Sequence, residues 1–367
     1  MKKYLTLTLL TALAATPVFA QEFSFSGELK TGFYWENTQE VDQETVEYVR
    51  LHNNDDAGGQ QGRFRLNMQF DKENAGAKVR FEVSSWPVSN IQPIWPYAFV
   101  FANFWEEQIK VSAGKLGDSP WAAGGPERWD ELDTIVGIRM ELKPAFAPGL
   151  NAGFVLNNFN EGLSIAANQV KLGDILQETV IGVSYVHDYF ALRFAFRGDS
   201  ALDSDPNRMD EGSRLLYRVE ERALDKILPG AQIWANGYFE GLDTPDRGAL
   251  YYNWIYFQYA PETFTAQIRL GLDSGSERQQ IIHVRPSFYY HLFDKLLSVG
   301  ASFSLCQNLE DYTNAPPYVY WRIQPQVRLN LSNVYFALVY QYEDSFKSTK
   351  DTNTKTHWIN LRLVYTF

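Results

Sequence analysis

The chain has 367 residues, a formal net charge of -11 and a single cysteine, Cys306. One cysteine excludes an internal disulfide and with it the small disulfide-stabilised folds. The acidic balance argues against nucleic acid as a partner. Aromatic residues make up 15% of the sequence, yet the mean hydropathy is only -0.31. This combination favours β-strands with one apolar face and one polar face.

The N-terminal segment reads MKKYLTLTLLTALAATPVFA. Two lysines precede an apolar run from Leu5 to Ala15, and the small residue Ala20 closes the segment, which is the layout of a cleavable secretory signal. We expect residues 1–20 to be removed. Residues 21–367 should then form one domain, because no linker or change of composition divides them. No later stretch approaches the roughly 18 consecutive uncharged apolar residues of a membrane helix.

Alternation of polar and apolar residues dominates the rest of the chain. In RFRLNMQF, Arg63 and Arg65 interleave with Phe64 and Leu66. A period of two predicts a strand with unlike faces, and the pattern resumes as KVRFEV after a turn, which predicts a hairpin. We count about eighteen such segments. They start near residues 23, 63, 77, 96, 109, 134, 150, 176, 189, 213, 231, 250, 263, 280, 296, 318, 333 and 356.

The connections between these segments alternate in length. Short turns such as ENAG, EEQ and HDY take every second place, and long polar loops, of which residues 36–61 are the first, take the others. Hydrocarbon offers no partner to a free backbone amide, so strands can cross a membrane only as a closed sheet. The rhythm predicts an all-β, membrane-spanning, antiparallel up-and-down β-barrel with short periplasmic turns and long extracellular loops. Eighteen strands are expected, with sixteen as the alternative.

The last predicted strand is INLRLVYTF. Arg362 would point into a water-filled lumen, while the apolar residues on either side of it would face lipid. The sequence here resembles the bacterial outer-membrane β-barrel porins, whose last strand commonly ends in Phe with apolar residues at alternate positions before it. The resemblance implies a location in the outer membrane. It also implies that the barrel-assembly machinery reads a signal formed by Phe367, Tyr365, Leu363 and Leu361.

Three aromatic clusters lie at or near predicted strand ends: PIWPYAFVFANFW, YYNWIYFQY and YVYW. Aromatic side chains at both interfaces are typical of membrane barrels, so we interpret the clusters as interfacial girdles. The alternative is a surface inside the lumen on which sugars stack. The residues of the three clusters are Trp95, Tyr97, Phe99, Phe101, Phe104, Trp105, Tyr251, Trp254, Tyr256, Tyr259, Tyr318, Tyr320 and Trp321.

The connection after Lys115 reads LGDSPWAAGGPERWDELD. General porins carry at this place, between their fifth and sixth strands, a loop that folds into the barrel and narrows the pore. The resemblance implies the same here, and the alternative is one more solvated outer loop. In the first case the acidic side of the constriction would be formed by Asp118, Glu127, Asp130, Glu131 and Asp133.

Basic residues occupy positions expected to face the lumen on the strands that adjoin this connection. Opposed charges across a narrow pore would orient dipolar solutes, and rings of charge set ion preference. The alternative is that the basic residues pair with Glu82, Glu141 and Asp273 and keep the wall rigid; the two interpretations are compatible. The predicted basic wall consists of Arg63, Arg65, Lys78, Arg80, Lys110 and Arg139.

Catalytic and metal sites find little support. A hydrolase needs a nucleophile, a base and an orienting group at one site, but the histidines are scattered singly: His52, His187, His283, His291 and His357. The spacing of Asp203, Asp205 and Asn207 resembles the start of a calcium loop. It lacks the glycine and the final glutamate that such a loop requires. We therefore predict no enzyme activity, no metal site and no cofactor.

These observations together predict an outer-membrane porin for passive diffusion of small hydrophilic solutes and ions. The partners expected are outer-membrane lipid, the barrel-assembly machinery, small polar solutes and, as in many porins, two further copies in a homo-trimer. Two alternatives stay open. One is a substrate-specific channel, for example for a saccharide or an anion; the other is a barrel adhesin whose loops bind ligands.

Overall fold

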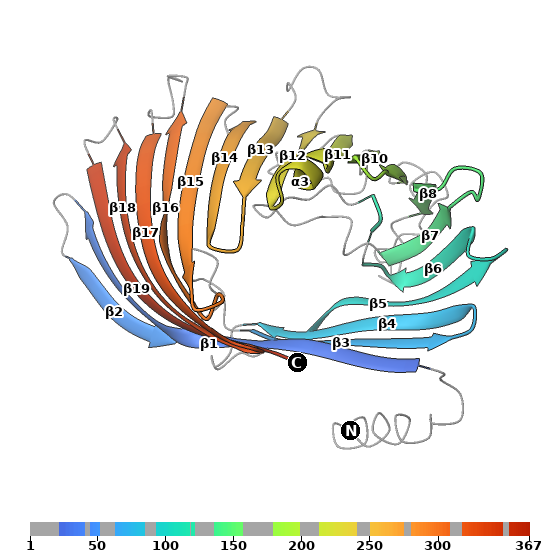
Figure 1. Ribbon diagram of the computed structural model, residues 1–367, viewed down its shortest axis with the longest axis horizontal. Helices are drawn as coiled ribbons and strands as arrows, with labels where there is room; N and C mark the ends of the chain where they lie inside the picture. Colours follow the sequence, from blue (N-terminus) through green and yellow to red (C-terminus); the bar gives the residue numbers. More distant parts are fainter. Residues whose placement is uncertain are drawn as a thin grey trace, which may run out of the picture.

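The computed structural model describes residues 22–40, 45–51, 63–84, 93–117, 119–121, 136–156, 179–198, 213–240, 250–274, 280–308, 318–347 and 352–367. Their strands form one closed antiparallel barrel with 18 strand positions, and each position pairs with the next one along the chain (Figure 1). The prediction of an all-β, antiparallel up-and-down barrel of eighteen strands is confirmed. The predicted secretory signal, residues 1–20, lies outside the described residues.

Nineteen strands and one short helix make up the described structure. They are β1 (Glu22–Glu40), β2 (Val46–Leu51), β3 (Arg63–Lys72), β4 (Ala75–Ser84), β5 (Pro93–Phe104), β6 (Ile109–Lys115), β7 (Val136–Leu142), β8 (Leu150–Leu156), β9 (Val180–Val186), β10 (Phe190–Arg197), β11 (Arg214–Glu221), α3 (Ala223–Ile227), β12 (Ala231–Glu240), β13 (Leu250–Tyr259), β14 (Phe264–Ser274), β15 (Gln280–Leu292), β16 (Leu297–Asn308), β17 (Tyr318–Leu331), β18 (Val334–Lys347) and β19 (Thr352–Thr366).

Strand β1 is long because it closes the barrel. On one side it pairs with β19, from Glu28 opposite Thr366 to Glu40 opposite Thr354. On its other side β3 pairs with residues 22–30 and β2 with residues 33–38, so β2 and β3 share one strand position. The prediction that residues 36–61 form a loop is therefore wrong for residues 36–40, which belong to β1, and for residues 46–51, which form β2 beside the C-terminal half of β1.

Short connections join every second pair of strands, and antiparallel pairing places all of them at one end of the barrel, here called the turn end. Several of their residues adopt a left-handed backbone, among them Glu73, Trp105, Asp294 and Ser332, with φ between 48° and 53°. In the two-residue turns 73–74 and 332–333, positive φ lets the turn match the twist of the strands that it joins. The other end of the barrel is called the loop end.

The outer surface of the barrel is apolar because the strands alternate. In β9, the inward residues Val180, Gly182 and Ser184 are buried, whereas the outward residues Ile181 and Val183 are exposed. Exposed apolar side chains continue around the barrel. A continuous apolar surface of this kind would be unfavourable in water but matches the hydrocarbon of a membrane.

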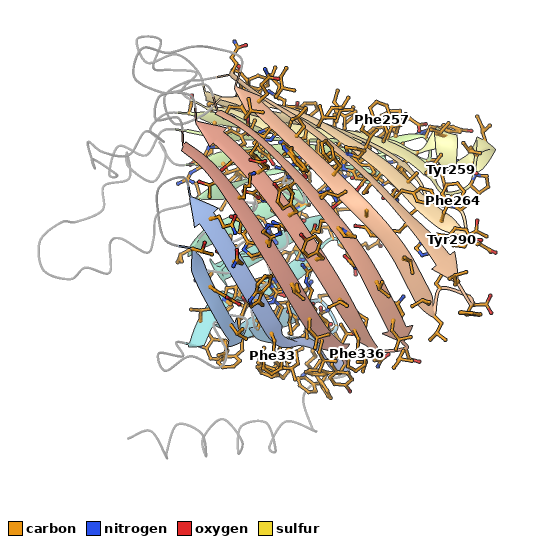
Figure 2. The ribbon with its side chains drawn as sticks, turned by 90° about the vertical axis from the view of Figure 1, so that its left-hand side faces the viewer. Phe33, Phe257, Tyr259, Phe264, Tyr290 and Phe336 are labelled. Atoms are coloured by element: carbon orange, nitrogen blue, oxygen red, sulfur yellow. The ribbon has the colours of Figure 1, made fainter. Side chains whose placement is uncertain are left out.

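Aromatic side chains gather on the outer surface at the turn end. Figure 2 shows Tyr259, Phe264 and Tyr290 along one edge of the barrel. The rings of Tyr259 and Phe264 lie 5.5 Å apart, and Phe264 lies 5.6 Å from Phe288. This arrangement is typical of an aromatic belt at a membrane–water interface.

Among the described residues, no helix is long and apolar enough to span a membrane.

Candidate functional site: the barrel lumen

The inner wall carries ion pairs between neighbouring strands. Residues directly opposite each other on adjacent strands point to the same face. Arg65 Nε donates to Glu82 Oε2 at 2.8 Å, and Arg63 Nε donates to Glu28 Oε1 at 3.1 Å. Further around the same wall, Arg322 Nε of β17 donates to Glu343 Oε2 of β18 at 2.8 Å. Charged groups are therefore concentrated inside the barrel, where carboxylates neutralise part of the positive charge.

The structure places all six residues of the predicted basic wall on the inner face of β3, β4, β6 and β7. Arg80 donates to Asn67 at 2.7 Å and lies 4.5 Å from the ring centroid of Tyr97. Lys110 lies 4.6 Å from the ring centroid of Phe101. Arg63 and Arg65 are paired with carboxylates, while Arg80 and Lys110 contact aromatic rings. The wall therefore contains both basic residues in ion pairs and basic residues outside ion pairs.

The connection after β6 begins inside the barrel. Trp121 is completely buried, and its Nε1 donates to the backbone oxygen of Asn151 at 3.2 Å. Its ring packs on the lumen-facing glycines Gly153 and Gly182, where any Cβ atom would crowd it. Leu116, 1% exposed, belongs to the same cluster. The described residues at the start of this connection, 116–117 and 119–121, thus pack against the inner wall.

A buried polar network holds this segment to the wall. Arg139 is 1% exposed; its Nη1 donates to the backbone oxygen of Gly117 at 3.0 Å, and its Nε lies 3.0 Å from Glu141 Oε1. Asn151 Nδ2 donates to Glu141 Oε2 at 3.1 Å. Arg139 therefore has a positioning role that the sequence did not reveal, since it connects β7 to the chain that enters the lumen.

The acidic residues predicted for the constriction lie outside the described residues: Asp118, Glu127, Asp130, Glu131 and Asp133. The weak calcium-loop candidate formed by Asp203, Asp205 and Asn207 lies outside them too.

The girdle prediction is wrong for Tyr97, Phe99, Phe101, Trp254 and Tyr256. These side chains face the lumen, as their cross-strand partners show. Trp254 is 1% exposed and Tyr256 is fully buried, so neither offers a free ring face for a sugar to stack on. Strand β13 has aromatic or aliphatic residues on both faces, and alternation therefore could not separate its inner from its outer side.

The lumen aromatics form a packed layer on β12 and β13. The rings of Trp234 and Tyr256 stack at 4.9 Å with an interplanar angle of 4°. Tyr238 and Tyr252 stack at 5.7 Å. Offset aromatic pairs of this kind add stability beyond their buried area. We interpret the layer as part of the rigid wall.

The histidines make separate local contacts. His283 Nε2 lies 2.9 Å from Asp273 Oδ1, and His357 Nδ1 lies 2.8 Å from the Tyr340 hydroxyl. His187 lies in a short turn between β9 and β10, and His52 is outside the described residues. In the part of the chain that the structure describes, no three His, Cys, Asp or Glu side chains are grouped so as to hold a metal ion.

No family model matches the chain, and no curated protein matches it by sequence. Solved structures do match. The outer membrane channel DcaP of Acinetobacter baumannii is 10% identical, with a TM-score of 0.57 over 96% of this chain and 99% of that chain. OpdQ of Pseudomonas aeruginosa is 10% identical, with a TM-score of 0.55 over 94% and 98%. OccAB4 of A. baumannii is 11% identical, with a TM-score of 0.53 over 96% and 100%.

These similarities concern the fold, and they agree with the geometry described above. The barrel is closed, its exterior is apolar and its charged groups are inside. The chain is therefore an outer-membrane β-barrel with the fold of porins.

Proposed function

We propose that the chain forms a water-filled channel through which small hydrophilic solutes and ions diffuse passively across the outer membrane. One observation carries the proposal: a closed barrel of 18 strand positions presents charged side chains inward and apolar side chains outward. Barrels of sixteen to eighteen strands are wide enough to leave an aqueous passage. The solved channels with this fold support the proposal by analogy.

The segment from Leu116 to Trp121 would set the narrowest part of this passage on the side of β7–β9. The acidic residues predicted for this connection would then face the basic wall: Asp118, Glu127, Asp130, Glu131 and Asp133. Arg80 is the basic group best placed to act on a solute, because among the described residues it contacts only the Asn67 amide and the Tyr97 ring, whereas Lys110 lies opposite Glu141. Such a constriction would favour polar and dipolar solutes.

Planar lipid bilayers test the proposal. Purified protein added to one compartment in about 1 M KCl should give discrete conductance steps of uniform size, as expected for a pore of fixed width. Protein unfolded before addition is the control and should give none. Absence of steps from correctly folded protein would refute the channel.

Liposome swelling separates the channel from an adhesin, the alternative raised by the sequence. A channel should admit small sugars at rates that fall with their size, whereas a sealed barrel should admit none. A substrate-specific channel would instead saturate with one solute and discriminate between solutes of equal size.

A further inference from the structure

A cavity of about 780 Å³ lies on the inner wall of the barrel at the turn end. It is lined from β14 to β19 by polar side chains and carries more positive than negative charge. Its basic groups are Lys295, Arg328 and Arg362, and Asp294 is the one carboxylate among its lining residues. The cavity lies apart from the aromatic and ion-paired walls described above.

The two arginines belong to one row of cross-strand neighbours. Arg328 of β17 lies opposite Ala337 of β18, and Ala337 lies opposite Arg362 of β19. The row continues on either side with Ser298 and Gly32. Neighbouring strands are about 4.8 Å apart, so the two arginine backbones are separated by roughly 10 Å. Ala337 between them is 1% exposed and is therefore covered by its neighbours, while both arginines line the cavity.

The same strand offers a contrast within the barrel. Arg322, six positions before Arg328 on β17, faces Glu343 on β18 and forms an ion pair with it. Arg328 faces Ala337 instead. Its Nε donates to Asn330 Oδ1 at 2.6 Å, and its guanidinium lies 3.8 Å from the ring centroid of Tyr335. The stacking fixes the guanidinium plane and leaves its terminal nitrogens available.

Within the described ranges, neither Arg328 nor Arg362 has a carboxylate at ion-pair distance. The Nε atom of Arg362 is buried and makes no hydrogen bond to another described group. Buried polar groups are normally satisfied, and a charged donor without a partner is costly. An anionic ligand in the cavity would balance the charge of Arg328, Arg362 and Lys295.

Neutral donors complete the cavity wall. His291 is held by two hydrogen bonds, with its Nδ1 2.9 Å from Ser298 Oγ and its Nε2 3.0 Å from Thr265 Oγ1. Tyr289 and Tyr335 line the same cavity. Hydroxyl groups beside paired guanidinium groups are suited to an oxyanion, because each oxygen can accept several hydrogen bonds.

We infer that this cavity is a binding site for a small oxyanion, that is, a solute carrying a phosphate or carboxylate group. The forked guanidinium groups match the oxygen geometry of such ions better than that of a spherical chloride. The inference deepens the proposed function, since it assigns to the channel a preferred class of solute at its turn end.

Phosphate titration in a planar bilayer tests the site. The current is carried by KCl, and inorganic phosphate replaces chloride at constant ionic strength. The wild-type conductance should fall along a saturable curve. R328Q and R362Q should each raise the half-saturating phosphate concentration by about ten-fold or more, the effect of losing a charge-assisted hydrogen bond.

R322Q is the matched control. It removes the same charge from the same strand at a place where Glu343 already balances it, and it should leave the half-saturating concentration within about two-fold. A337D adds a carboxylate between the two arginines and should abolish the saturable response while leaving both arginines in place. The site would be overturned if R322Q and R362Q raised the half-saturating phosphate concentration equally, or if the wild-type conductance did not saturate with phosphate.

Calorimetric titration of phosphate into the detergent-solubilised barrel separates this inference from the channel itself. A heat of phosphate binding that is present in wild type and absent in R362Q and A337D would support the site even if bilayers showed no conductance. Conductance steps without phosphate binding would support the channel and refute the site. Heat-modifiable migration of each variant verifies that the barrel is folded before either measurement.

Discussion

Gly27 in β1 and Phe367 exchange two backbone hydrogen bonds, from Gly27 N to Phe367 O at 2.8 Å and from Phe367 N to Gly27 O at 3.1 Å. The phenylalanine ring lies over the glycine, where any Cβ atom would overlap it, and it stacks 6.5 Å from the ring of Phe64. This contact joins the first and last strands at the outer surface of the barrel.

Replacing Gly27 with valine should therefore weaken barrel closure. The side chain would displace the Phe367 ring, and overpacking of this kind costs about 1–3 kcal/mol. We expect G27V to lower the fraction of heat-modifiable, folded barrel in outer-membrane preparations several-fold. T31V changes an outward residue on the same strand and should assemble normally. Equal assembly of G27V and wild type would show that the contact is dispensable.

The proposed assembly signal makes a related prediction. F367A should reduce insertion into the outer membrane, because it removes both the ring on Gly27 and the terminal aromatic of the signal. L329A, which removes an outward apolar side chain from β17, is the control for general loss of lipid contact. Pulse-labelling followed by membrane fractionation measures the insertion rate. Equal slowing in the two variants would argue against a special role for Phe367.

Breaking the buried Arg139–Glu141 pair should destabilise the barrel. E141Q leaves Arg139 charged at 1% exposure, and losing one partner of a buried pair costs about 3–5 kcal/mol. We expect a large fall in the free energy of unfolding in urea. E28Q breaks the more exposed Arg63–Glu28 pair, in which the side chains are 14% and 25% exposed, and should cost less. A loss in E28Q as large as that in E141Q would contradict the burial argument.

Removing Trp121 should widen the passage. W121A empties the space over Gly153 and Gly182, and the segment that starts at Leu116 loses its anchor on the wall. We expect larger conductance steps, together with a loss of about 3–5 kcal/mol in the free energy of unfolding. W105A alters a tryptophan that is 73% exposed in a turn and should change neither quantity much. Unchanged step size in W121A would show that this segment does not limit the passage.

Much of the fold could be predicted from the sequence, because a closed membrane sheet forces a period of two onto each strand. INLRLVYTF is an example: Leu361 is 47% exposed on the outer surface, and Arg362 lines the inner cavity. Strand β2 was missed because VEYVRL lies between polar stretches and pairs only with residues 33–38 of β1. Strand β17 contains Pro325, and proline lacks the backbone N–H that a sheet ladder uses. The strand tolerates it, and the β17–β18 register resumes at Gln326.

The lumen could be predicted only in part. Side-chain phase placed Arg65 and Arg139 inside, yet burial depends on what packs over each residue. Arg139 is covered by the segment that carries Trp121, and the alternation of residues around Arg139 does not predict that contact. The paired arginines of the turn-end cavity depend on Ala337, which lies between them in space but nowhere near Arg362 in sequence. The pairing register of β17, β18 and β19 is needed to see that Arg328 and Arg362 lie in one row.

The alternation of lipid and water contact is the physical basis of this account, and spin labels measure it most directly. Ser302 and Phe303 are adjacent in β16; Ser302 donates to Gln324 inside the lumen, whereas Phe303 is 36% exposed outside. In a C306A background reconstituted in liposomes, a nitroxide at S302C should collide mainly with a water-soluble nickel chelate. A nitroxide at F303C should collide mainly with oxygen dissolved in lipid. Equal accessibility at the two positions, or the reverse pattern, would contradict an aqueous passage enclosed by the barrel.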